Sequence, residues 1–163
     1  MHKPPRQKRK YLGSLTLPLV WLAITAVGIY LRPSPDGHGT HQQLGLPPCG
    51  SVILFDRPCP GCGLTTSWTA TIHGRLSEAF QAHPLGPPLY LAFTMFAIAN
   101  VWAFAKKRTI DTSGSRWTFA IVAAGLVFFG FGLTRFFSTP KYAAPDELGD
   151  YFKRVAGVSG KRG

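Results

Sequence analysis

Apolar residues gather in three blocks along the chain, at residues 11–31, 85–105 and 117–137. Nearly all charged residues lie between or outside these blocks; the exception is Arg135, near the end of the third. Each block is 21 residues long, and about 20 apolar residues in a helix suffice to cross the hydrocarbon core of a bilayer. The pattern predicts an all-α integral membrane protein with three transmembrane helices. Arg135 is expected to extend its side chain to the membrane interface.

The first block differs from the apolar core of a cleaved signal peptide. Residues 1–10 carry five Lys or Arg residues, as a secretory leader would. The apolar core of such a leader, however, has about 7–15 residues and precedes a cleavage site of small residues. The block here is longer, contains Trp21 and Tyr30, and is followed by Arg32. We therefore expect an uncleaved anchor.

The connection after the first block is polar and carries all three cysteines. Residues 32–63 are rich in Pro and Gly, which is typical of turns and loops. Within them, the apolar run at residues 51–55 is too short to assign as a strand or as a turn that skims the membrane. We expect this connection to be a loop built around the cysteines.

Residues 64–83 contain no proline and predict a helix. The helix is expected to end at residue 83, because a residue that precedes proline, here Pro84, disfavours the helical conformation. Gly74 interrupts the segment. Its apolar residues recur mainly at intervals of four, at Leu64, Trp68, Ile72, Leu76 and Phe80. One apolar face favours a helix that lies at the membrane interface or partly enters the membrane. His73, Arg75 and Glu78 are then expected to face headgroups or water.

The charge distribution predicts the orientation of the chain. The net charge of +11 comes from 18 Lys and Arg against 7 Asp and Glu, with five basic residues in segment 1–10 and four in segment 106–116. Basic residues accumulate on the cytoplasmic side of membrane proteins. This bias places segments 1–10 and 106–116 in the cytoplasm, and the cysteine loop and tail 138–163 outside, although five basic residues in the tail oppose it.

Because the basic residues flank apolar blocks, binding to anionic lipid headgroups explains their positions better than binding to nucleic acid does. No nucleic-acid-binding motif is present in the sequence. The expected partners are the lipid bilayer and another membrane protein, and no nucleic acid.

Cys49, Cys59 and Cys62 are the candidate site residues, and Cys59-Pro60-Gly61-Cys62 is a CxxC turn. Three chemistries fit this spacing. A disulfide between Cys49 and either of the other two would staple the loop, by about 3 kcal/mol for a loop of this size. The CxxC pair could exchange disulfides with another protein, with Cys59 as nucleophile and Cys62 or Cys49 as resolving thiol. The three cysteines could also bind zinc, completed by a histidine, but a single CxxC pair is a weak zinc signal.

His38 and His41 are candidate metal ligands, but two solvated loop histidines are the more common finding. No other catalytic residue set occurs in the sequence. We therefore expect a non-enzymatic membrane subunit or scaffold whose loop is stapled by a disulfide or a metal and contacts a partner. The alternative function is a membrane thiol–disulfide oxidoreductase.

Residues 59–65 (CPGCGLT) and residues 79–85 (AFQAHPL) together resemble a family of small bacterial membrane proteins catalogued as domain of unknown function 2752. The resemblance covers roughly residues 45–91. It implies a location in the bacterial cytoplasmic membrane and a cysteine loop, but no established activity. Two positions depart from the family pattern: Thr66 stands where the family usually has Arg, and His83 where it often has Asn.

Overall fold

The computed structural model describes residues 13–108, 110, 112, 114–142, 149, 152 and 153. The predicted basic segment 1–10, the start of the first block and most of the tail lie outside these residues. The described part of the chain forms six α-helices and one 3-10 helix, and contains no strand. The all-α prediction is confirmed for this part of the chain.

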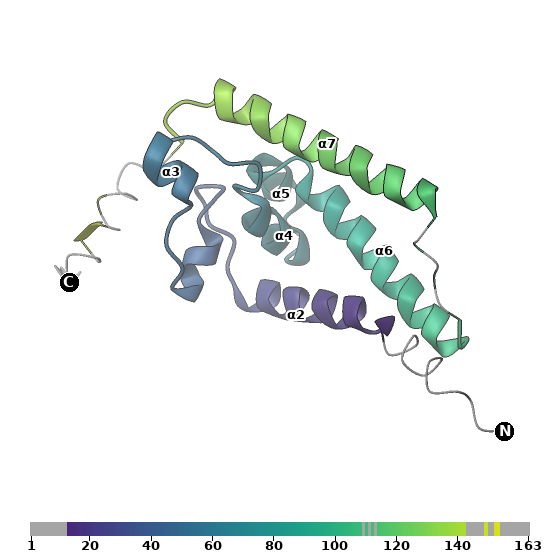
Figure 1. Cartoon of the computed structure of the whole chain (residues 1–163). Helices are drawn as coiled ribbons and strands as arrows, with labels where there is room; N and C mark the ends of the chain where they lie inside the picture. The colour runs from purple at the N-terminus through teal and green to yellow at the C-terminus, as the bar shows by residue number, and fades with distance from the viewer. Residues whose placement is uncertain are drawn as a thin grey trace.

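Three long helices run roughly lengthwise through the molecule (Figure 1). They are α2 (Thr16–Tyr30), α6 (Gly86–Ala105) and α7 (Ser115–Ser138). The connection between α6 and α7 lies at the same end as the beginning of α2. The cysteine loop and the end of α7 lie at the opposite end.

Two helices, α6 with 20 residues and α7 with 24, are long and apolar enough to cross a membrane. Helix α2 has 15 residues, which extend about 22 Å at 1.5 Å per residue, whereas the hydrocarbon core is about 30 Å thick. Three spans are therefore not confirmed. Helix α2 begins at Thr16. Pro18 thus falls in the first turn, where its missing N–H breaks no helical hydrogen bond.

The segment predicted as one helix over residues 64–83 is two helices, α4 (Leu64–Ile72) and α5 (Leu76–Ala82). They are separated at Gly74, whose φ of 74° is incompatible with a continuous helix. The two helices pack against each other through small side chains, and the Ser67 hydroxyl donates to the Ala79 carbonyl at 2.7 Å. The most buried side chains of the pair are Thr66, Ser67, Thr69, Ala70, Ala79 and Ala82.

Helix α2 is joined to its neighbours by polar contacts between side chains. Trp21 Nε1 donates to Thr94 Oγ1 at 2.9 Å, and the hydroxyls of Thr25 and Tyr90 are 2.9 Å apart. His73 is exposed, as the sequence predicts, but its ring also contacts the end of α2. Its Nε2 lies 3.0 Å from the Leu31 carbonyl oxygen and 3.2 Å from that of Gly28, because the last carbonyls of α2 need donors. Arg75 pairs with Glu78 in an exposed ion pair, which agrees with the expectation that both side chains face headgroups or water.

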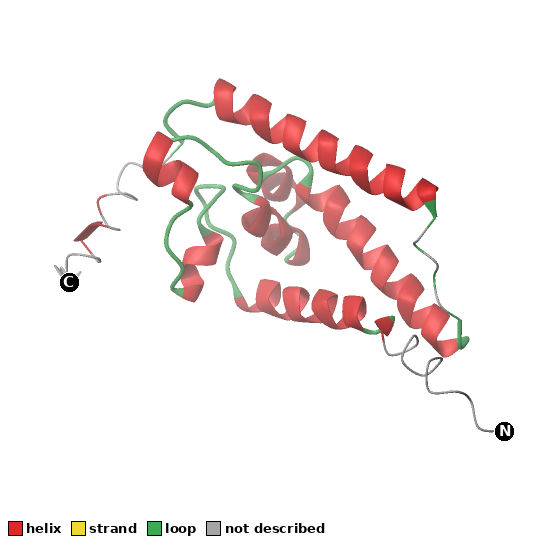
Figure 2. Ribbon diagram, in the orientation of Figure 1, coloured by secondary structure: helices red, strands yellow, loops and turns green. Residues whose placement is uncertain are grey.

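The end that carries the cysteines consists mainly of loops, with two short helices (Figure 2). These are η1 (Thr40–Leu44) and α3 (Gly50–Phe55). The short apolar run left unassigned at residues 51–55 is therefore helical. Thr40, which is fully buried, joins η1 to α4 through a 2.8 Å hydrogen bond with the Thr66 hydroxyl.

Gly132 is the point where α7 meets the cysteine loop. It is buried, and a side chain at this position would overlap Pro60, backbone included. The sequence predicts a close helix contact from Gly125, Gly130 and Gly132. The close contact is made by Gly132, and with a loop rather than with a helix; Gly125 and Gly130 face open space.

We predict that Gly132→Ala lowers the stability of the full chain by about 1–3 kcal/mol, because overpacking forces the loop and helix apart. Thermal unfolding in detergent measures the change. Gly130→Ala is the matched control on the same helix and should leave stability unchanged or raise it slightly. Equal stability of the two variants would contradict the contact.

Candidate functional site

The part of the cysteine loop that carries Cys59 and Cys62 is a tight turn, which is followed directly by α4. The Cys62 N–H donates to the Cys59 carbonyl, and the Leu64 N–H donates to the Gly61 carbonyl, both at 3.0 Å. Gly63, which precedes α4, has a φ of 85°, and a side chain there would overlap the Ala82 carbonyl. Only glycine fits both constraints. The turn is therefore fixed by its own backbone and by its contact with the end of α5.

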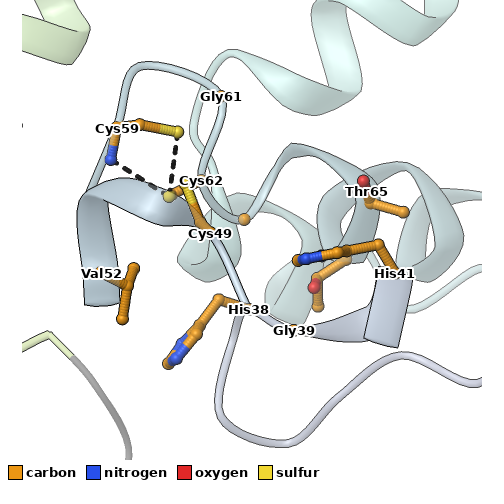
Figure 3. Close-up of a pocket in the computed structure, with 11 residues that line it drawn as sticks. His38, Gly39, His41, Cys49, Val52, Cys59, Gly61, Cys62 and Thr65 are labelled. Atoms are coloured by element: carbon orange, nitrogen blue, oxygen red, sulfur yellow. Dashed lines mark hydrogen bonds between the residues drawn. The ribbon is translucent and has the colours of Figure 1, made fainter. Parts of the chain in front are cut away.

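The structure brings together the three cysteines that the sequence singles out (Figure 3). Cys49 immediately precedes α3, and Cys59 and Cys62 lie on the turn. All three Sγ atoms lie within 4.8 Å of one another. The Sγ atoms of Cys59 and Cys62 are 3.0 Å apart, a hydrogen-bond distance that exceeds the ~2.05 Å of a disulfide bond. The three residues carry free thiols here, and the stapling disulfide stays a prediction.

The two cysteines of the turn differ in burial and in acidity. Cys62 is 7% exposed, and its thiol donates to Cys59 Sγ. This hydrogen bond is the main reason that the pKa of Cys59 falls to about 5, with burial acting in the opposite direction. The same bond, together with burial, raises the pKa of Cys62. The pair is therefore one partly exposed thiolate next to one buried thiol.

A cavity of about 200 Å³ opens beside the sulfur atoms. Both histidines that the sequence suggests as ligands line it. His38 Nδ1 lies 2.9 Å from the Asp36 carbonyl, and its ring packs 4.5 Å from that of Tyr142. His41 Nε2 lies 3.1 Å from the Pro47 carbonyl. The His41 ring points across the cavity toward the cysteines, whereas the His38 ring points away from them (Figure 3).

Arg135 of α7 holds the loop from outside. Its Nη1 donates to the Cys62 carbonyl at 3.0 Å, its Nη2 lies 3.4 Å from the Tyr142 hydroxyl, and its guanidinium lies over the rings of Phe131 and Tyr142. The sequence predicts only that Arg135 extends to the membrane interface, and this prediction misses its contact with the cysteine loop. The signal that could have identified the contact is that Arg135 is the only charged residue in the third block, because ionisable residues within apolar helices are usually functional.

Two further side chains tie the loop to the helices. Arg57 Nη1 donates to the Phe136 carbonyl near the end of α7 at 3.1 Å. His83, fully buried, lies with Nε2 3.0 Å from the Pro60 carbonyl, and its ring contacts those of Phe128 and Phe131. Burial lowers the pKa of His83, so the neutral ring donates through Nε2. In the sequence, His83 stands out only as the residue before Pro84 and as a departure from the family pattern.

Residues 49–97 match a family model whose description is "Protein of unknown function (DUF2752)". Over these residues the chain is similar to that family. The match confirms the resemblance noted in the sequence. No curated protein and no solved structure is significantly similar to the chain. The matched residues include all three cysteines, α4, α5 and the first part of α6. Arg135 and His41 lie outside residues 49–97. The cavity, and the set of side chains that hold the cysteine loop, therefore include residues from inside and from outside the matched range.

We predict that alkylation of Cys59 by iodoacetamide follows a titration with a midpoint near pH 5, because the thiolate is the reactive form. The rate should be at its plateau by neutral pH. In the Cys62→Ala variant the main stabilising hydrogen bond is lost, and the midpoint should move toward about 8.5, the value of a free thiol. Peptide mass spectrometry assigns the labelled cysteine. An unchanged midpoint in the variant would contradict the proposed cause.

Proposed function

We propose that the chain is an integral protein of a bacterial cytoplasmic membrane. The support is the large apolar surface of the two long helices, where Met95 is 72% exposed and Phe119 is 77% exposed. The core helix of a soluble protein would bury such residues, and exposed apolar patches of this extent mark contact with membrane or protein. The inner contacts of α4 and α5 use small and hydroxyl side chains, as helices packed within membranes do.

The orientation follows from charge. Lys106, Lys107, Arg108 and Arg116 lie at or next to the α6–α7 connection, and the cysteine loop lies at the opposite end of the long helices. Since basic connections stay in the cytoplasm, we place the α6–α7 connection and the N-terminus there. The cysteine loop is then extracytoplasmic.

The role that the geometry supports best is a non-enzymatic membrane subunit or scaffold whose cysteine loop contacts a protein partner. The observation that carries this proposal is the clamp formed by Arg57, His83 and Arg135, each of which binds backbone of the loop or of α7. A surface that is already ordered loses little conformational entropy on binding. A staple through the cysteines, either a disulfide or a metal ion, would complete this ordering.

A second candidate function, thiol–disulfide exchange, is favoured by the acidity difference between Cys59 and Cys62. The Cys59 thiolate would attack a disulfide of a substrate protein and form a mixed disulfide. Cys62 would then attack Cys59 Sγ, so that the substrate is released with two thiols and the pair becomes oxidised. A redox titration separates the two functions. A pair that cycles near the potential of its compartment supports exchange, and a bridge that resists the glutathione pool supports the staple.

For the location, we predict that a membrane-impermeant maleimide labels the native cysteines in intact cells after reduction and treatment with a metal chelator. The matched control replaces all three cysteines by Ser and carries Thr112→Cys in the α6–α7 connection. That variant should react only after the cells are permeabilised. The reverse pattern would contradict the orientation, and recovery of the chain in the soluble fraction would contradict the membrane location.

For the partner, we predict that a photo-crosslinking amino acid at Leu46 in the cysteine loop captures a discrete membrane protein in cells. Leu46 is about as exposed as Trp102 at the other end of the molecule, so a crosslinker at Trp102 is the matched control for exposure. Capture at position 46 alone supports the scaffold. No protein adduct at position 46, or the same adducts at both positions, would count against a partner for the loop.

A further inference from the structure

We propose that Cys49, Cys59 and Cys62 bind a zinc ion whose fourth ligand is His41. This inference rests on the stapled cysteine loop of the proposed function and specifies the staple as a metal ion. It uses residues from three separate segments: the segment before α3, the turn before α4, and η1. The metal would join these segments to one another.

The sulfur atoms are spaced as a tetrahedral zinc site requires. With Zn–S bonds of about 2.3 Å, sulfurs at the corners of a tetrahedron are about 3.8 Å apart. The observed sulfurs lie in the same range, with 3.0 Å between Cys59 and Cys62 and no pair farther apart than 4.8 Å. A single disulfide would use two of the three sulfurs and leave the third thiol in the cavity, whereas one metal ion uses all three.

His41 is the better of the two histidines as fourth ligand. Its ring points across the cavity toward the cysteines. Its Nε2 is held by the Pro47 carbonyl at 3.1 Å; if Nε2 carries the proton, Nδ1 has the free lone pair. Histidines that bind metal usually donate their other N–H to a carbonyl or carboxylate in this way. His38 instead packs on Tyr142 and points away from the sulfurs.

Binding needs no oxidant or reductant. Zn²⁺ displaces the protons that the sulfur atoms still carry, which leave to solvent, and it accepts the lone pair of His41 Nδ1. Three thiolates and one neutral imidazole around Zn²⁺ give a centre of net charge −1. The Arg135 guanidinium, which binds the Cys62 carbonyl, provides a nearby positive charge. Cys49 and Cys59 are partly exposed, so the ion has a path into the cavity.

The test uses the full chain, purified in detergent under reducing conditions. Elemental analysis gives the zinc content, a chelator competition gives the affinity, and Co²⁺ substitution gives a spectrum that reports thiolate ligation and tetrahedral geometry. We expect about one zinc per chain. The His41→Ala variant should bind at least about tenfold more weakly, since the loss of even an outer-shell partner costs about 10–100-fold. The His41→Cys variant should restore tight binding, which separates loss of a ligand from loss of the fold.

His38→Ala is the matched control and should bind zinc as the unmodified chain does. An unmodified chain that takes up no zinc with its thiols reduced would overturn the metal site. Equal affinity of His41→Ala and the unmodified chain, or an equal loss in His38→Ala, would overturn the assignment of His41. These failures leave the membrane labelling pattern and the Leu46 crosslink unaffected, so they are distinguishable from failure of the proposed function.

Discussion

The contact between the cysteine loop and the last turns of α7 is the constraint on which the site depends. Gly132 lets Pro60 approach the helix axis, and Arg135, one turn further on, binds the carbonyl of Cys62. His83 holds Pro60 from the other side. Without these contacts, the turn would be fixed only by its own backbone hydrogen bonds and by its attachment to α4. With them, the loop has a single position, and Cys49 and His41 face its sulfurs from neighbouring segments.

The interior of the helical part follows a related constraint. Ala70 and Ala79 are fully buried, while large apolar side chains such as Leu126 point outward. Small residues let α4 and α5 pack closely, and hydroxyl groups such as that of Ser67 supply hydrogen bonds in place of apolar burial. This distribution places the large apolar side chains on the outside of the helices, and it keeps a closely packed base under the cysteine loop.

The helical class and the proximity of Cys59 to Cys62 were predictable, because block length and CxxC spacing are local properties of the sequence; the approach of Cys49 was open among several pairings. The break at Gly74 could be suspected, but not the pairing of α4 with α5. Contacts between distant segments were not predictable: Arg135 with Cys62, His73 with the end of α2, and Gly132 with Pro60. Such contacts depend on how the helices are arranged, which neither periodicity nor spacing encodes. For the same reason, the sequence could not rank His41 above His38.

The central claim is that the docked loop brings three sulfurs to one point in the folded protein. X-ray absorption at the zinc edge, on the zinc-loaded full chain in lipid nanodiscs, measures this most directly. The account predicts a first shell of three sulfur atoms at about 2.3 Å and one nitrogen atom at about 2.0 Å. A shell made only of nitrogen and oxygen, or one with fewer than three sulfur atoms, would contradict it.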